Sequence, residues 1–201
     1  TTANSGQYLG LLNATNGTAS APILAVELDT ILSPEFRDIN SNHVGIDVNS
    51  LVSRQAQPAG YYDPNGGAFR DLKLNSRNPM QVWVDYDAQS KRLEVTLAPL
   101  KVPKPRRPLL SEAIDLSTLM ADAMYVGFSA SSGVVSGHHY LLGWSFSLDG
   151  PAPPLDFSKL PALPRLGPKP RSKVLDIVLP LASELLVAAA LAAVFFFLWR
   201  R

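Results

Sequence analysis

The chain has 201 residues, of which 46% are hydrophobic and 17% charged, a composition typical of one globular domain with appended segments. Its formal net charge of +1 gives no overall field that would favour nucleic acid, so we expect no nucleic-acid partner. Cysteine is absent, which excludes a disulfide framework and any metal site or nucleophile built on cysteine.

The first apolar segment, residues 7–12 (QYLGLL), predicts a short strand. Two adjacent sequons follow it, Asn13-Ala14-Thr15 and Asn16-Gly17-Thr18. Sequons in a polar loop predict glycosylation at Asn13 and Asn16. Because this modification belongs to secreted proteins, the pair favours an extracellular or lumenal position for this part of the chain.

The next predicted strand is an apolar run that two carboxylates interrupt (ILAVELD). Side chains alternate along a strand, so Glu27 and Asp29 lie on one face, about 7 Å apart at the usual rise. Burial of like charges on one face of a strand is unfavourable. A cation bound between the two carboxylates would remove that cost.

The following loop supplies two further ligands for such a cation. Ser33-Pro34 predicts a turn, Asp38 comes after it, and His43 begins a second predicted strand over residues 43–50. Carboxylate oxygens and an imidazole nitrogen suit a transition metal beside a harder ion such as Ca²⁺. Asp38 or His43 alone would more often be a solvated loop residue, but the whole set favours a metal site.

A hairpin is predicted in the middle of the chain, where residues 80–87 and 91–97 both alternate in hydropathy. Val82, Val84 and Tyr86 share one face of its first strand. We expect this apolar face to lie in the core of a sandwich.

Shorter elements flank the hairpin. Residues 51–57 predict a strand, residues 61–67 (YYDPNGG) a turn, and residues 111–120 a short helix or turn. Residues 101–107 (KVPKPRR) are basic, but prolines and the lack of an aromatic residue for base stacking favour a solvated connector over a phosphate-binding arm.

Two last strands are predicted over residues 124–130 (MYVGFSA) and 140–148 (YLLGWSFSL). The sequence GFSAS at Gly127 approaches the nucleophile elbow of hydrolases, but it ends in serine and no helix pattern follows. His138 and His139 are neighbours on an extended chain, so they point to opposite sides and cannot bind one ion together. With no catalytic set in the chain, we expect no enzyme activity.

The composition changes at residue 150. Residues 150–172 are rich in proline and predict a stiff juxtamembrane stalk. Residues 173–201 predict a single-pass transmembrane helix with a basic stop-transfer end, and the span itself is expected over residues 177–199. A count of positive charges alone would place the N-terminal side in the cytoplasm, whereas the sequons favour an extracellular N-terminal domain.

Residues 25–50 resemble the metal-binding hairpin of the legume lectins, and DINSNHVGIDVNS is most similar to lectin-type plant receptor kinases. SGQYLGLLN, VGFSASSG with HHYLLGWSF, and the stalk sequence PPLDFSKLP also resemble this family. The resemblance implies an all-β, concanavalin-like sandwich over residues 1–149. The sandwich would be N-terminally incomplete, because the match begins partway into the family.

The resemblance also implies Mn²⁺ and Ca²⁺ as cofactors. It assigns Glu27, Asp38 and His43 to manganese, and it assigns Asp29 and Asp38 to both ions. The carbonyl of Ile31 would bind calcium, and an aromatic residue that stacks on the sugar is common at this position in the family.

Ser33 stands where the family has an asparagine that binds calcium and donates a hydrogen bond to the sugar. The substitution puts both roles of this position in question. The other sugar-binding positions of the family lie upstream of this chain.

The implied function is carbohydrate recognition by the extracellular part of a plant plasma-membrane receptor whose kinase is not in this chain. One alternative stays open, a membrane-tethered interaction module with a decayed sugar site that binds a protein or an apolar small molecule. Homodimer formation is also left open.

Overall fold

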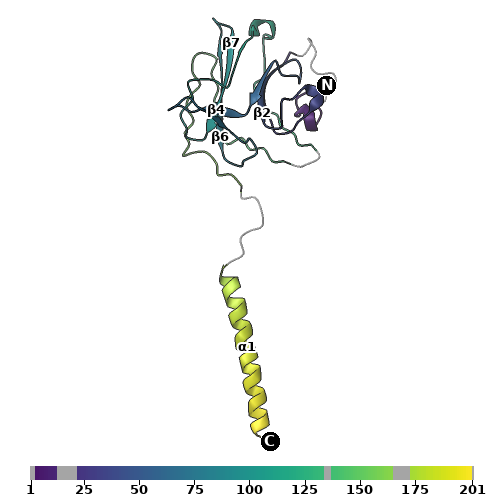
Figure 1. Cartoon of the computed structure of the whole chain (residues 1–201), viewed down its shortest axis with the longest axis vertical. Coiled ribbons are helices and arrows are strands. Elements are labelled where there is room, and N and C mark those ends of the chain that lie inside the picture. Colours follow the sequence, from purple (N-terminus) through teal and green to yellow (C-terminus); the bar gives the residue numbers. More distant parts are fainter. Residues whose placement is uncertain (1–2, 13–21, 134–136, 165–172, 201) are drawn as a thin grey trace. The chain divides into compact units, whose positions relative to one another are not determined.

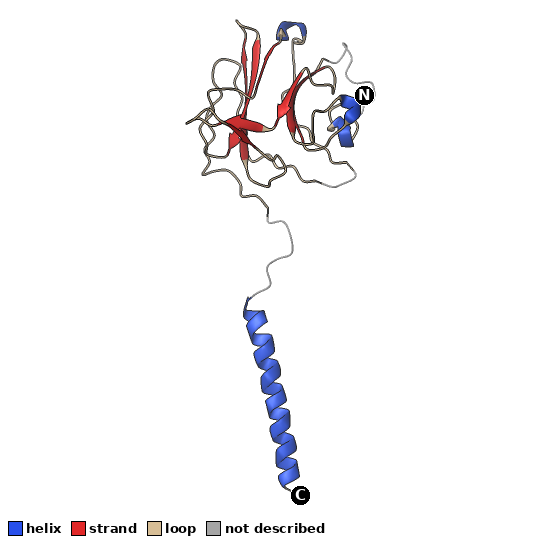
Figure 2. Ribbon diagram, in the orientation of Figure 1, coloured by secondary structure: helices blue, strands red, loops and turns tan. Residues whose placement is uncertain are grey.

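The computed structural model describes residues 3–12, 22–133, 137–164 and 173–200, and the chain falls into two compact units. Unit 1, Thr1–Lys159, holds the strands, and unit 2, Leu160–Arg201, holds one long helix, α1 (Lys173–Trp199) (Figure 1, Figure 2). The sequons at Asn13 and Asn16 and part of the expected stalk lie outside the described residues.

Unit 1 is built from antiparallel sheets. The first sheet has the order β1-β2-β3, with bounds Leu24–Asp29, His43–Val48 and Gln55–Pro58. The second pairs β4 (Gly60–Tyr62) with β5 (Phe69–Asp71). The third has the order β6-β7-β8, with bounds Met80–Asp87, Arg92–Pro99 and Leu110–Ala113. Among the described residues, short 3₁₀ helices accompany them: η1 (Gly6–Tyr8), η2 (Pro34–Phe36) and η3 (Leu116–Thr118).

Strand β2 is buried on both faces, which links the core to the polar site described below. Val44 and Ile46 point into the main apolar core and have no exposed surface. The alternating residues His43, Gly45 and Asp47 face the opposite side. The core combines these residues with side chains of β7 and β8 and of the segments around them: Ala59, Leu93, Val95, Leu97, Leu109, Leu110, Ile114 and Leu116.

The first and third sheets meet through their edge strands β3 and β8, and each polar contact of this junction involves a side chain. The backbone N–H of Ser111 donates to Oε1 of Gln55 at 3.0 Å. Arg54 and Glu112 form an ion pair at 3.3 Å beside it. The two sheets therefore share an apolar core while keeping separate backbone ladders.

The strand predicted over residues 7–12 is wrong. These residues form η1 and a turn, because Leu9 and Gly10 adopt positive φ angles of 55° and 64° that a strand does not accommodate. Tyr8 then packs edge-on against Phe36, with ring centroids 5.6 Å apart. The apolar residues of this segment thus reach a core by way of a turn.

The strands predicted over residues 124–130 and 140–148 are also wrong. Neither segment pairs with a strand in the part of the chain that the structure describes, although their hydropathy alternates. Strand structure requires a partner for the backbone N–H and C=O groups, and alternation cannot supply one. Phe128 and Trp144 contact each other edge-on at 5.5 Å, and both remain at least half exposed.

The hairpin predicted in the middle of the chain is confirmed as β6 and β7, which pair from Met80–Pro99 to Asp87–Arg92. The core position expected for its first apolar face holds only in part. Val82 and Val84 are 36% and 51% exposed on β6, one of the two edge strands of its sheet. Tyr86 packs against the core and donates its hydroxyl to the carbonyl of Ile114.

Two shorter predicted elements differ from the structure in their bounds or type. The strand expected over residues 51–57 begins only at Gln55, after bends at residues 51–54. The helix or turn expected over residues 111–120 is shared between β8 and η3, whose cap Asp115 accepts from the backbone N–H of Ser117.

Unit 2 consists of α1 and the segment before it. Helix α1 covers the residues over which a membrane span is expected, and Pro180 lies inside it. Searching the described residues gives no helix that is both long enough and apolar enough to cross a membrane.

Candidate metal centre

Strands β1 and β2 bring three metal-ligating side chains together. Their antiparallel register places Asp29 opposite His43 and Glu27 opposite Gly45, so these side chains share one face. One ligand atom each from Glu27, Asp29 and His43 lies within 4.8 Å of the others. The equal orientation expected for Glu27 and Asp29 is therefore confirmed, while their role as metal ligands stays a prediction.

The face of β1 that carries the carboxylates is the more buried one. Glu27 and Asp29 are 6% and 8% exposed, whereas Leu28 between them is 42% exposed. Burying a carboxylate is unfavourable unless it is paired or bound to a cation. A strand that buries its acids and exposes its leucine is organised around a polar centre.

His43 is oriented by a backbone carbonyl. Its Nδ1 lies 2.8 Å from the carbonyl oxygen of Asn40, which can only accept, so Nδ1 carries the proton. Nε2 lies 3.2 Å from Oε1 of Glu27, and this hydrogen bond raises the pKa of His43. A metal ion at Nε2 would displace that second proton, so metal binding and protonation compete at one atom.

Asp38 approaches the same centre from the loop. Its Oδ2 accepts the backbone N–H of Ser33 at 2.6 Å, and its Oδ1 lies 3.9 Å from Nε2 of His43. Burial raises the pKa of Asp38, with Asp29 and Glu27 adding to the effect. Asp29 is held similarly, because its Oδ1 accepts the N–H of Ile31 at 2.8 Å. Each carboxylate keeps a second oxygen for a cation.

Asp47 and Ser53 also belong to the centre, and our sequence analysis missed both. The hydroxyl oxygen of Ser53 lies 2.6 Å from Oε1 of Glu27 and 2.7 Å from Oδ1 of Asp47. One hydroxyl has one proton to donate, so one of these carboxyls must donate to Ser53. Burial, and then the charge of Glu27, raise the pKa of Asp47 to about 7, so Asp47 holds a proton more readily than an ordinary aspartate does.

The spacing between Asp47 and His43 could have predicted that Asp47 belongs to the centre. Four residues apart on a buried strand, the two side chains point to the same face. Ser53 offered no comparable clue, because it lies in the bend between β2 and β3.

Gly45 makes room for this arrangement. A Cβ atom there would lie 2.1 Å from Oγ of Ser53 and 2.4 Å from Oε1 of Glu27. No side chain can occupy that space while both groups keep their positions. The glycine therefore lets Ser53 and Glu27 approach the backbone of β2 closely.

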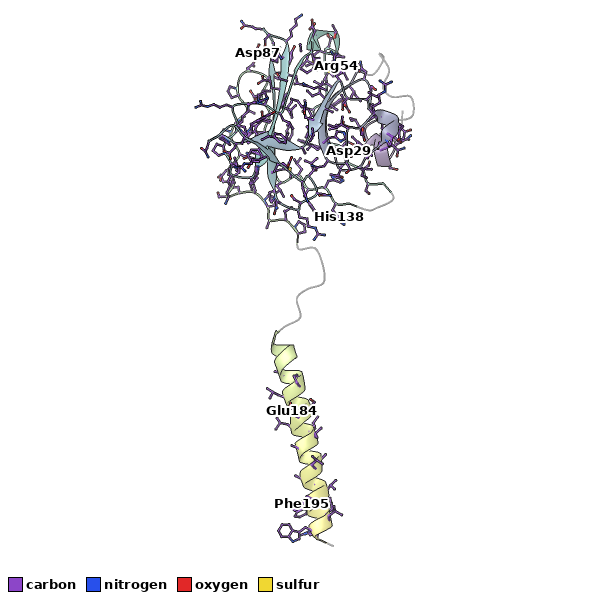
Figure 3. The ribbon with its side chains drawn as sticks, in the orientation of Figure 1. Asp29, Arg54, Asp87, His138, Glu184 and Phe195 are labelled. Atoms are coloured by element: carbon purple, nitrogen blue, oxygen red, sulfur yellow. The ribbon has the colours of Figure 1, made fainter. Side chains whose placement is uncertain are left out.

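The remaining predicted residues surround the centre. Ser33 is 5% exposed and precedes η2, whereas the side chain of Ile31 is 48% exposed. Figure 3 shows the labelled side chain of His138 at a different place on unit 1 from that of Asp29. Leu32 and Ile39 are also half exposed, so the loop beside the buried acids has an apolar surface.

The donor set fits the metals that the resemblance implies. Mn²⁺ suits a site of several buried carboxylates and one imidazole whose second nitrogen is held by a backbone carbonyl. Ca²⁺ suits a neighbourhood rich in carboxylates.

Comparison with known proteins gives concordant results. The legume lectin domain family matches residues 1–162. The L-type lectin-domain containing receptor kinase SIT2 of Oryza sativa subsp. japonica is 54% identical over 202 residues, covering 100% of this chain and 30% of that protein. The L-type lectin-domain containing receptor kinase IV.1 of Arabidopsis thaliana is 51% identical over 199 residues, covering 98% of this chain and 29% of that protein. This chain thus spans less than a third of the length of these relatives.

A solved structure is similar as well. Basic winged bean lectin with Tn-antigen is 28% identical, with a TM-score of 0.51 over 66% of this chain and 47% of that chain.

Proposed function

Because the chain belongs to the legume lectin family, we propose that it recognises a carbohydrate as the extracellular part of a plant membrane receptor. The observation that carries this proposal is the buried group of Glu27, Asp29 and His43 on paired strands, in a domain of that family. Support for a receptor comes from the two receptor kinases, which are more than half identical to this chain. No catalytic role is proposed for the chain itself.

Two ions would be held by these residues. Glu27, Asp38 and His43 would bind Mn²⁺ together with Asp29, which bridges to Ca²⁺ as Asp38 does. The carbonyl of Ile31 would complete the Ca²⁺ site. Bound ions would neutralise the buried carboxylates and fix the loop that presents the sugar-binding residues.

The calcium site is expected to be weaker than in family members with asparagine at the position of Ser33. A serine hydroxyl is shorter than an asparagine amide and a poorer oxygen ligand for calcium. Losing one ligand weakens the free energy of calcium binding by about 1–3 kcal/mol, the scale of an unmade polar contact. Sugar affinity should fall with it, because the same side chain would orient a sugar hydroxyl.

A second candidate function is supported by the apolar surface of the loop. Ile31, Leu32 and Ile39 are 48%, 50% and 49% exposed beside the acidic group. Such a surface would suit a protein or an apolar small molecule as ligand in a domain whose sugar site has decayed.

The decisive measurement is calorimetric titration of Ca²⁺, then of simple sugars, into the chain in detergent micelles, with its lectin domain completed at the N-terminus by the family's upstream segment. Ser33→Asn should tighten Ca²⁺ binding about tenfold and raise sugar affinity, whereas Ser41→Asn, an exposed change in the same loop, should do neither. If Ser33→Asn tightens neither, position 33 is outside the site. If the parent binds no sugar but binds an apolar ligand, the second candidate function replaces the first.

We propose in addition that residues 177–199 anchor the chain in the plasma membrane, with unit 1 outside. Its support is the uncharged sequence from Leu185 to Trp199, followed by two arginines. Expression with a signal peptide in plant cells should add glycan mass at Asn13 or Asn16. An unglycosylated chain whose unit 1 is cut by cytosolic protease would reverse this orientation.

A further inference from the structure

Asn42, the half-buried residue before His43, makes hydrogen bonds through its side chain and its backbone. Its side-chain Oδ1 accepts the backbone N–H of Leu74 at 2.9 Å, and its Nδ2 donates to the carbonyl of Leu72 at 2.8 Å. Its backbone N–H donates to Oδ1 of Asn40 at 2.7 Å, and its carbonyl accepts the N–H of Ala59 at 2.9 Å. Both ends of the amide and both backbone groups are therefore used.

We propose that Asn42 is a positioning residue for the metal centre, acting through His43. The inference rests on the proposed function, because it presupposes a metal ion at Nε2 of His43. Asn42 would touch no ion itself. Its role would be to fix the point at which β2 begins, and with it the direction of the imidazole.

The position of His43 explains why such a residue is needed. His43 is the first residue of β2, and the ends of strands open more easily than their centres. Its Nδ1 bond goes to Asn40, in the same turn, so that bond cannot anchor the turn to the rest of the protein. Sheet pairing holds His43 on both sides, opposite Asp29 and Pro58, and the amide of Asn42 adds an anchor to a segment outside that sheet.

The anchor is firm because its other end is part of the core. Leu72 and Leu74 follow β5 and pack against the main apolar core. Asn42 thereby ties the metal loop to a segment 30 and 32 residues away, with two bonds in a fixed geometry. A rotation of the turn would break both bonds at once.

One consequence distinguishes positioning from simple stabilisation. If Asn42 links the loop to residues 72–74, a metal ion that orders His43 must also slow the opening of that segment. Linkage is reciprocal, so loosening residues 72–74 must weaken metal binding. The amide of Leu74, which donates to Asn42, is the natural reporter of this coupling.

The experiment uses the full chain in detergent micelles and Mn²⁺ as the probe. Asn42→Ala should weaken Mn²⁺ binding by 10- to 100-fold in calorimetry, the usual effect of removing a residue that orients a ligand. Asn75→Ala, an exposed amide just beyond the same segment, is the matched control and should bind within about twofold of the parent. Asn42→Asp keeps the acceptor for Leu74 and loses the donor for Leu72, so it should fall between the two.

Hydrogen exchange followed by mass spectrometry supplies the second readout. In the parent, Mn²⁺ should slow exchange of the peptide containing residues 72–74, and in Asn42→Asp this protection should shrink. If Asn42→Ala fails to fold, the Asn42→Asp variant and the exchange of the parent decide alone. A parent that binds Mn²⁺ without protecting residues 72–74, or variants that bind like the parent, would overturn the inference. A parent that binds no Mn²⁺ would overturn the metal site itself.

Discussion

The hairpin β1–β2 and the segments 124–130 and 140–148 have similar hydropathy patterns and opposite outcomes. In the hairpin, each residue from Leu24 to Asp29 has a partner between His43 and Val48, fewer than thirty residues away along the chain. The later segments pair with no strand in the described part of the chain, and Phe128 and Trp144 stay 64% and 51% exposed. Alternation shows that a segment can form a strand, and a partner within reach decides whether it does.

The strongest way to break this contrast is to disturb the hairpin at Gly45. Gly45→Ala should lower the free energy of unfolding by about 3 kcal/mol, because the new methyl group overlaps Ser53 and Glu27 in a packed site. Urea denaturation of the full chain in micelles would measure this loss. Gly66→Ala, at a position with open space and ordinary φ, is the control and should change little. Equal midpoints for the two variants would show that the site is not closely packed.

The metal-free hairpin should also lose stability as the pH rises. Burial raises the pKa of Asp47 from 3.8 to about 7, so the folded chain retains a proton that the unfolded chain releases. Stability is therefore greatest below pH 4 for this group and falls as the pH rises to 7, by a few kcal/mol at most, on the order of 1.4 per pKa unit. The raised pKa values of Asp38 and His43 act in the same direction.

Asp47→Asn tests this pH dependence, because its amide can donate to Ser53 as the protonated acid does. The variant should flatten the fall in stability between pH 4 and 7, measured by denaturation with a chelator present. Asp122→Asn, which changes an exposed carboxylate, should leave the slope as it is. An unchanged slope in Asp47→Asn would mean that Asp47 is ionised in the fold. Metal affinity should rise over the same range, because ligand protons must leave.

The smallest effect on the free energy of unfolding is expected in residues 124–130 and 140–148. Trp144→Ser should lower the free energy of unfolding by less than about 1 kcal/mol, because the side chain is half exposed and an edge-on contact such as that with Phe128 contributes about 1 kcal/mol. Removing an exposed aromatic should instead reduce self-association, measured by light scattering. A loss of stability as large as that of Gly45→Ala would show that this segment is packed in solution.

The parts of the fold that the sequence analysis predicted correctly are those whose partners follow closely. The hairpin of β6 and β7 and the pair β1–β2 are of this kind, with turns that the sequence marks by polar residues. Residues 7–12 failed for a different reason. Their apolar character is satisfied by packing Tyr8 on Phe36, and periodicity does not distinguish that contact from a strand.

The candidate site could also be predicted only in part. Glu27, Asp29 and His43 could be placed together because strand alternation puts both carboxylates on one face and His43 begins the next predicted strand along the chain. Ser53 could not be predicted, because its contact with Glu27 depends on the bend that follows β2. The space at Gly45 is a property of packing between strands and leaves no trace in the hydropathy pattern.

The junction between β3 and β8 has a mechanical consequence for unit 1. A force that pulls the first sheet from the third would be resisted there by the Gln55–Ser111 bond, the Arg54–Glu112 ion pair and apolar packing, with no ladder loaded in shear. Apolar surfaces resist separation only at short range, so this junction should yield at a lower force than the β1–β2 ladder. Under tension, the metal-binding sheet would then detach as an intact piece, with its ligands still together.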